Sequence, residues 1–329
     1  MNQFFRQLTA EQQVGALFVL VFGLLALASA TLSLLSLRER PQTPESDAQR
    51  ERLRELGGLL RTSWGMVSVF WLAWVLGERV ATVLFALVAF FALREFITLS
   101  PTRRGDHRSL VLAFFAVLPV QFWLVASRHF DLFTVFIPVY VFLALPLASA
   151  LAGDPQRFLE RNAKLQWGVM VCVYGMSHVP ALLLLRFPKW GDRNAFLVFF
   201  LVFVVQTGMV AQHLASRRLR RAPYAPRISQ SFNGSSWAIG VAAGGLLGGL
   251  LAGITPFKPG QALAMALVAC VAGSGGHLVM KALKRDRGAP TWGAQGQSVT
   301  GASGLLDRVD ALCFAAPVFF HSVRWYFGA

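Results

Sequence analysis

Long apolar runs alternate with short polar segments along most of this sequence. The first run, Val14–Leu37, contains no charged residue. A helix needs about 20 mainly apolar residues to cross the hydrocarbon core of a bilayer. The pattern therefore predicts about ten transmembrane helices, at Val14–Leu37 and at residues 62–77, 80–94, 109–127, 132–152, 165–185, 194–212, 237–255, 261–280 and 309–327. The runs 62–77 and 80–94 are short and could be two tilted spans or a re-entrant pair.

Composition supports the same class. Of the 329 residues, 55% are hydrophobic and only 14% are charged, whereas soluble domains are about 25% charged. The three cysteines, Cys172, Cys270 and Cys313, lie in apolar runs without metal-binding spacing, so we expect them in the core. These values exclude a typical soluble fold and predict an all-α, polytopic integral membrane protein.

The distribution of basic residues predicts the orientation in the membrane. The net charge is +15, and 23 of the 31 Lys and Arg fall on one side when ten spans alternate, against eight on the other. Cytoplasmic loops are enriched in Lys and Arg. We therefore expect both termini outside and the basic loops in the cytoplasm, and no nucleic acid is needed to explain the charge.

The first basic segment, residues 38–61, mixes acidic and basic side chains. After Pro44 it could form an amphipathic surface helix, or it could be a solvated linker. From the sequence we favour the linker. Glu95, at the end of a predicted span, is open to two interpretations as well: a functional acid or an interfacial ion pair with Arg94.

Two later cytoplasmic segments carry candidate binding residues. Residues 213–237 contain five arginines among Pro, Ser, Asn and Gly. Arginine forks suit phosphate oxygens, but such a loop can equally contact anionic lipid headgroups. By composition alone we favour lipid contact for this segment.

Residues 281–310 are more specific. Asp307 and Asp310 are three residues apart at a predicted helix start, so they share one face. Two carboxylates can hold Mg²⁺ together with substrate phosphates, and the nearby Lys284, Arg285 and Arg308 can bind phosphates. Acids at a helix N-terminus can also simply complement its dipole. Spacing alone does not separate these interpretations.

The segments Lys281–Arg285 and Gly301–Asp310 have the form of a known C-terminal signature, in which a Lys-Arg pair precedes a glycine-rich loop and the motif D-R-x-D. Pro226-Arg227-Ile228-Ser229 is similar to a second motif, I-S-P-K-K-T-x-E-G. At these residues the sequence resembles the phosphatidate cytidylyltransferase (CDP-diacylglycerol synthase) family. Shorter stretches at residues 91–96, 153–155 and 177–178 look like a bacterial branch of that family.

The resemblance implies an enzyme of phospholipid biosynthesis in the bacterial inner (cytoplasmic) membrane. Such enzymes transfer cytidylyl from CTP to phosphatidic acid, with Mg²⁺ as cofactor, and the family suggests a homodimer. Residue by residue, Asp307 and Asp310 are implied as catalytic, Mg²⁺-binding carboxylates. Ser229, Lys284, Arg285 and Arg308 are implied as substrate-binding residues. We divide the chain accordingly into N-terminal transmembrane helices, 1–193, and a cytidylyltransferase-like region, 194–329.

The sequence also departs from the family pattern. An expected acid falls at His277, the signature serine at Lys281, a Lys-Asp pair at Pro290-Thr291, and the histidine of the glycine-rich loop at Ala302. Nucleotidyl transfer depends on charge that offsets developing negative charge. The alternative function is therefore a catalytically degraded relative that binds phospholipid or a partner membrane protein. Whether the protein is an active enzyme stays open at this point.

Overall fold

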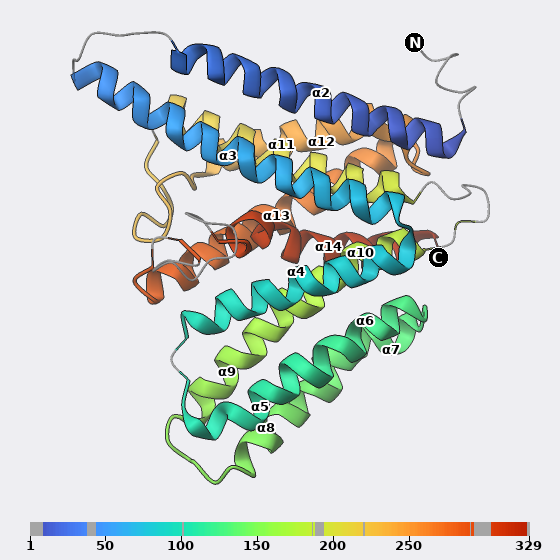
Figure 1. The fold of residues 1–329 in the computed structure, drawn as a ribbon, viewed down its shortest axis with the longest axis vertical. Helices are drawn as coiled ribbons and strands as arrows, with labels where there is room; N and C mark the ends of the chain where they lie inside the picture. Colours follow the sequence, from blue (N-terminus) through green and yellow to red (C-terminus); the bar gives the residue numbers. More distant parts are fainter. Residues whose placement is uncertain are drawn as a thin grey trace. The chain divides into compact units, whose positions relative to one another are not determined.

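The computed structural model describes residues 9–37, 44–100, 102–185, 187, 194–219, 221–289, 291–292 and 304–327. Within these ranges every regular element is a helix, as Figure 1 shows. The longer helices are α2 (Ala10–Leu37), α3 (Pro44–Val75), α4 (Glu78–Thr98), α11 (Ala195–Leu219), α12 (Gly234–Leu250), α13 (Pro259–Asp286) and α14 (Leu306–Phe327).

Between α4 and α11 the chain forms helices with internal irregularities. Three spans contain a π-helical segment, a wider turn that is frequent at functional sites. These shorter elements are η1 (Arg104–Asp106), α5 (His107–Leu112), η2 (Ala113–Val117), α6 (Leu118–Ala126), α7 (Phe130–Val135), η3 (Phe136–Val141), α8 (Phe142–Ala150), α9 (Phe158–Gly168), η4 (Val169–Gly175) and α10 (Met176–Leu184), with η5 (Leu251–Ile254) after α12.

Eight helices in the described ranges are long and apolar enough to cross a membrane. The predicted spans 62–77 and 309–327 are also helical, at the end of α3 and in α14, but they are not among these eight. The all-α polytopic class is therefore confirmed, and the count of ten stays a prediction. The eight are Glu11–Leu37, Glu78–Thr98, Arg104–Ala126, Phe130–Ala150, Phe158–Leu184, Ala195–Leu219, Gly234–Ile254 and Pro259–Asp286.

The chain divides into two compact units, Met1–Ala81 and Thr82–Ala329. In the first, α2 and α3 pack antiparallel through aromatic rings: Phe18 lies 5.4 Å from Trp74 and Phe22 lies 5.6 Å from Trp64, between ring centroids. Because α3 begins at Pro44, the interpretation of residues 38–61 as a linker is wrong from that residue onward. Pro is well placed in a first helical turn, and the Glu, Gln, Arg and Leu that follow are good helix formers.

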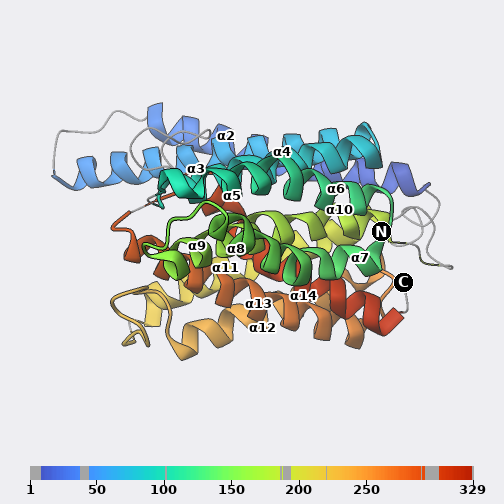
Figure 2. The same cartoon turned by 90° about the horizontal axis from the view of Figure 1, so that it is seen from below.

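The second unit holds the remaining helices, which run side by side in similar or opposite directions (Figures 1 and 2). Glycines on α12 allow close contact with α11 and α13. A Cβ added at Gly240 would lie 2.6 Å from the carbonyl oxygen of Gly208, and one at Gly244 would lie 2.9 Å from that of Val204. Small residues spaced four apart on a helix allow such close approach between membrane helices. The predicted boundary at 193/194 rests on motif content and stays a prediction.

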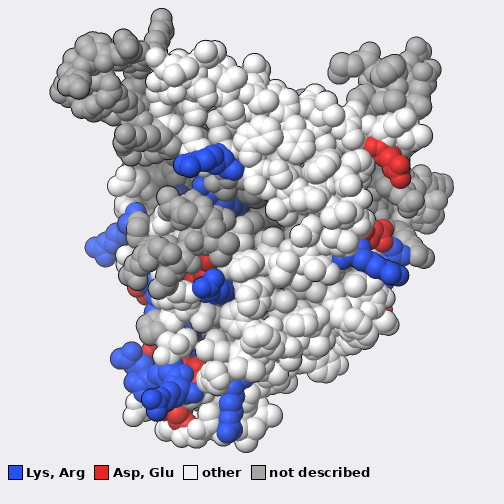
Figure 3. Space-filling view, in the orientation of Figure 1, with Lys and Arg blue, Asp and Glu red and all other residues white. Residues whose placement is uncertain are grey.

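Charged side chains lie mainly at the helix ends. Over the second unit, Figure 3 shows Lys and Arg gathered at the left edge, fewer at the right edge, and a largely uncharged band between them. The three cysteines are buried and free, as expected. A band of this kind is what a bilayer requires of the helix surfaces that face it.

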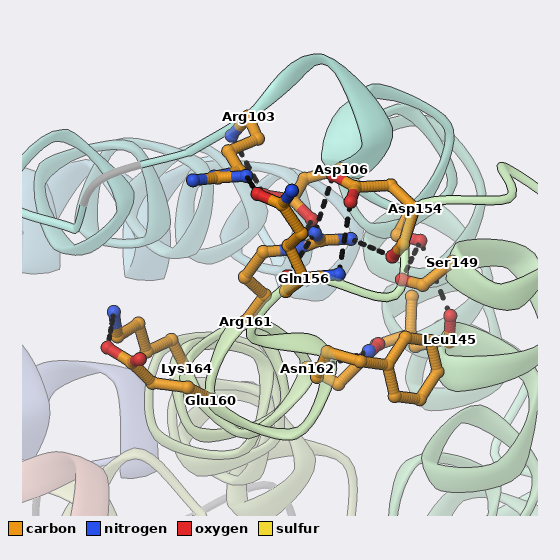
Figure 4. A network of polar contacts seen from close by, with 12 residues as sticks. Arg103, Asp106, Leu145, Ser149, Asp154, Gln156, Glu160, Arg161, Asn162 and Lys164 are labelled. Carbon is orange, nitrogen blue, oxygen red and sulfur yellow. Dashed lines mark hydrogen bonds and ion pairs between the residues drawn. The ribbon is translucent and has the colours of Figure 1, made fainter.

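A buried ion cluster fixes the loops around α5 and α9 (Figure 4). The Arg161 guanidinium donates to Asp106 Oδ1 and to Asp154 Oδ2, both at 2.7 Å, and to the carbonyl oxygen of Gln156 at 2.6 Å. The Arg161 side chain is only 4% exposed. Two carboxylates and two carbonyl oxygens, the second from Asp154, satisfy this guanidinium, so the cluster is a structural clamp.

Candidate functional site

The last turns of α13 carry three polar side chains on one face. His277, Lys281 and Lys284 are separated by four and three residues, which places them in one row along the helix. His277 contacts Asp310 and Lys284 contacts Asp307, both on α14, and Lys281 contacts Ser229 in the loop before α12. α13 is therefore the element around which the site is assembled.

The two aspartates of α14 are fully engaged. Asp307 pairs with the Lys284 ammonium and also accepts a hydrogen bond from the Trp292 amide at 2.8 Å. Asp310 Oδ2 lies 2.7 Å from His277 Nδ1, and its Oδ1 accepts from the Ala311 amide at 2.6 Å. Both carboxylates are largely buried, so these contacts compensate for their lost hydration.

The Ser229 loop reaches the same row from α12. Ser229 is 6% exposed, and its hydroxyl lies 3.4 Å from Lys281 Nζ and 3.2 Å from the Ser231 hydroxyl. Asn233 caps α12 by accepting from the Ser236 amide at 2.9 Å. Trp237, one turn into α12, donates to Ser274 Oγ on α13 at 2.9 Å. The first turn of α12 thus lies against α13 just before His277.

Glu95 of α4 holds the start of α14. Its two carboxylate oxygens accept from the amides of Leu305 and Leu306, each at 2.9 Å, where α14 begins. Glu95 is 2% exposed, whereas Arg94 is exposed. A carboxylate is favourable at a helix N-terminus because it satisfies unpaired amides and complements the dipole. Glu95 therefore caps a helix more than 200 residues away in the sequence.

Trp292 and Gly304 complete this corner. The Trp292 ring stacks on Phe96 of α4 with centroids 5.4 Å apart and is 1% exposed. A Cβ at Gly304 would lie 2.6 Å from Glu95 Oε2 and would clash with the Trp292 carbonyl oxygen. Only glycine fits between these groups. Residues 293–303 of the signature loop, including Ala302, lie outside the described residues.

The sequence-predicted site residues are partly brought together. Asp307 contacts Lys284, Asp310 contacts His277 and Ser229 contacts Lys281. The three contacts are separate, and all are made by one row of side chains on α13. Arg308 is half-buried at the start of α14, while Arg285 is exposed at the end of α13. Their catalytic and binding roles stay predictions.

The sequence did not predict that His277 and Lys281 belong to the site. They stand where the family pattern expects an acid and a serine, so they were interpreted as departures from the pattern, yet they contact Asp310 and Ser229. Glu95 was one of several acids open to a functional interpretation, and nothing local in the sequence pointed to the amides that it caps. For Lys281 and Lys284 the three-residue spacing on one helix was a signal that could have been used.

The described residues do not fit a preformed Mg²⁺ site. They contain no group of three or more His, Cys, Asp or Glu side chains arranged for a metal ion. Each aspartate of the pair already holds two protein donors, and Lys281 and Lys284 place positive charge beside them. The sequence of 293–303 contains no acidic residue that could add a carboxylate. The surplus charge of this corner therefore favours an anion.

Comparisons with known proteins agree with the resemblance. The profile of the cytidylyltransferase family matches residues 60–326. The chain is also 34% identical, over 278 residues, to an Escherichia coli K12 protein named "Uncharacterized protein YnbB"; the match covers 81% of this chain and 86% of that protein. The profile match extends from the second half of α3 through almost the whole of α14, and so includes every residue of the site. The chain therefore belongs to the cytidylyltransferase family.

Proposed function

We propose that this protein is a membrane-embedded phosphatidate cytidylyltransferase-like enzyme. In this reaction a phosphate oxygen of phosphatidic acid attacks the α-phosphorus of CTP, the bond to the β-phosphate breaks, and the products are CDP-diacylglycerol and pyrophosphate. The observation that carries the proposal is the row His277, Lys281 and Lys284, which meets both aspartates of the D-R-x-D motif and the Ser229 loop at one end of the helices.

The chemistry matches what this row offers. The nucleophile is an already ionised phosphate, so the reaction needs little general base catalysis. The main obstacle is that two polyanions must approach each other, and catalysis of phosphoryl transfer is mainly positioning and charge compensation. Fixed ammonium groups in a partly dehydrated corner supply such compensation.

Each residue then has a proposed role. Lys281 and Lys284, with Arg285 and Arg308 near the cytoplasmic surface, bind phosphate oxygens. Asp307 orients the Lys284 ammonium and fixes the Trp292 backbone. Asp310 orients His277, and Ser229 adds a neutral hydroxyl beside Lys281.

Turnover by the purified protein tests this proposal. Full-length protein in detergent, supplied with CTP, phosphatidic acid and Mg²⁺, Mn²⁺ or Zn²⁺, should release pyrophosphate. Asp307→Asn should abolish release because it breaks the pair with Lys284. Asp286→Asn is the matched control: this aspartate, 63% exposed, contacts only its neighbour Arg287 among the described residues. Absence of turnover above a blank with all three metals would remove the enzymatic proposal.

The second candidate is a catalytically degraded relative that binds phospholipid or a partner membrane protein. One observation favours it: where the family pattern expects an acid, His277 engages Asp310. Under this alternative, a bound phospholipid or a stable partner copurifies with the protein, and mass spectrometry of the purified sample identifies it. A delipidated, solitary and active protein would contradict it.

The remaining expectations belong with this proposal. We place the protein in the bacterial inner membrane with both termini outside and the motif loops in the cytoplasm, supported by the asymmetry of 23 to eight basic residues. The family resemblance also implies Mg²⁺ as cofactor, which the contacts of the two aspartates do not favour, and a homodimer. Size-exclusion chromatography with light scattering would determine the oligomeric state.

A further inference from the structure

We propose that the triphosphate of the nucleotide is bound at this site by the Lys281 ammonium and its neighbours without a divalent cation. The inference rests on the proposed function and specifies how its nucleotide is held. The family resemblance leads to the opposite expectation, a triphosphate held through Mg²⁺ on aspartates. The contacts of the site support binding without the metal ion.

Lys281 differs from Lys284 in its partners. The Lys281 side chain is half-buried, and within the described residues its ammonium contacts only the neutral Ser229 hydroxyl, at 3.4 Å. An ammonium has three donors. Lys284, by contrast, is paired with Asp307. Among the described residues, the ammonium of Lys281 is therefore not neutralised by a carboxylate in direct contact, and it still has N–H donors that can bind an anion.

Charged groups of both signs lie near the Lys281 ammonium. The negative one is Asp310 of the D-R-x-D motif, whose carboxylate interacts electrostatically with Lys281 and is hydrogen-bonded to His277 and to the Ala311 amide. Lys284 and Arg285 add positive charge near the same ammonium. Lys284 is compensated by Asp307, but Lys281 and the exposed Arg285 have no carboxylate in direct contact among the described residues, and both aspartates already accept from two protein donors. A divalent cation would therefore find no free carboxylate here, whereas a polyphosphate would find complementary charge at Lys281.

Neutral hydroxyls and a helix start lie beside Lys281. The Ser229 and Ser231 hydroxyls lie beside each other, and the first turn of α12 follows at Gly234. The Trp237–Ser274 bond holds this turn against α13. Hydroxyls and a helix start beside an ammonium add donors suited to phosphate oxygens. The Lys281 ammonium and the Ser229 loop thus place their donors side by side, where one anion could contact both.

Equilibrium binding of CTP to the full-length protein in detergent tests the proposal, once with Mg²⁺ and once with excess EDTA. We expect binding in EDTA to be no weaker than in Mg²⁺, since free CTP carries more negative charge than its Mg²⁺ complex. Lys281→Gln should weaken binding about tenfold or more in both conditions, the loss typical of one charge-assisted contact. Lys281→Arg, which keeps the charge, should stay within about threefold.

Lys164→Gln is the matched control, because Lys164 is also partly buried but is paired with Glu160; it should leave CTP binding unchanged. Binding that requires Mg²⁺ would overturn this inference and leave the proposed function standing. Binding in EDTA that survives Lys281→Gln would overturn the assignment to Lys281. Absence of CTP binding in both conditions would overturn the inference and the proposed function together. The comparison of Mg²⁺ with EDTA uses the unaltered protein, so it does not depend on how a variant folds.

Discussion

At the scale of single residues, Glu95 makes the hydrogen bonds that span the largest sequence separation within the described part of the chain, 210 and 211 residues. Its carboxylate holds the two amides at the start of α14, and α14 carries Asp307 and Asp310 within its first five residues. The orientation of both aspartates therefore depends on a side chain of α4. A buried carboxylate that accepts two amide hydrogen bonds is also costly to replace, because the amides would be left unsatisfied.

We expect Glu95→Ala to destabilise the protein by about 1–3 kcal/mol, the usual range for buried donors that lose their acceptor. Glu95→Gln should cost less, because its single carbonyl oxygen can still accept one of the two bonds. Thermal unfolding in detergent, followed by tryptophan fluorescence, measures both. Glu160→Gln, at an exposed position, should shift the melting temperature little. Equal melting temperatures for Glu95→Ala and the unaltered protein would contradict the capping role.

At the scale of elements, the position of α14 also depends on its contact with η4. The two elements touch where Gly175 lies against the backbone of Cys313, one turn beyond Asp310. A Cβ at Gly175 would clash with the Cys313 carbonyl oxygen, and backbone cannot move aside as a flexible side chain can. Any larger residue there must push the two elements apart.

Gly175→Ala should therefore destabilise the fold by about 1–3 kcal/mol through overpacking. It should also reduce CTP binding, because the shift reaches Asp310. Gly275→Ala in α13 is the control: a Cβ there meets nothing within 4 Å, so alanine should be neutral or slightly stabilising. Thermal unfolding and CTP binding, measured on both variants, check this. A Gly175→Ala protein as stable as Gly275→Ala would show that the contact is not tight.

Elements were more predictable than their contacts. Apolar runs predicted the positions of the eight helices that are long and apolar enough to cross a membrane, because the bilayer requirement acts on local sequence. The helix that begins at Pro44 was the less favoured of two interpretations, because the charged residues there resemble those of a linker. The contacts of Glu95, His277 and Lys281 join residues between 33 and 211 positions apart, and no local pattern encodes such pairings. The spacing of Asp307 and Asp310 predicted a shared face, but not that Lys284 and His277 would occupy it.

At the scale of the whole molecule, the proposals need the site to face the compartment that holds CTP. The charge asymmetry predicts that the end of α13 faces the cytoplasm and that the start of α7 faces the outside. Both places have a well exposed acid: Asp286 is 63% exposed and Asp131 is 96% exposed. The native cysteines are all buried, so an introduced cysteine at either position can be labelled against a low background.

In intact cells, a membrane-impermeant maleimide should label Asp131→Cys and leave Asp286→Cys unlabelled. After the cells are opened, both should react, because both side chains are exposed to water. The unaltered protein, with Cys172, Cys270 and Cys313 in the core, serves as the blank. The reverse pattern, with Asp286→Cys labelled from outside, would place Lys281, Lys284 and both aspartates away from cytoplasmic CTP. The proposed reaction and the metal-independent binding of its nucleotide would then both fail, whatever the family of the chain.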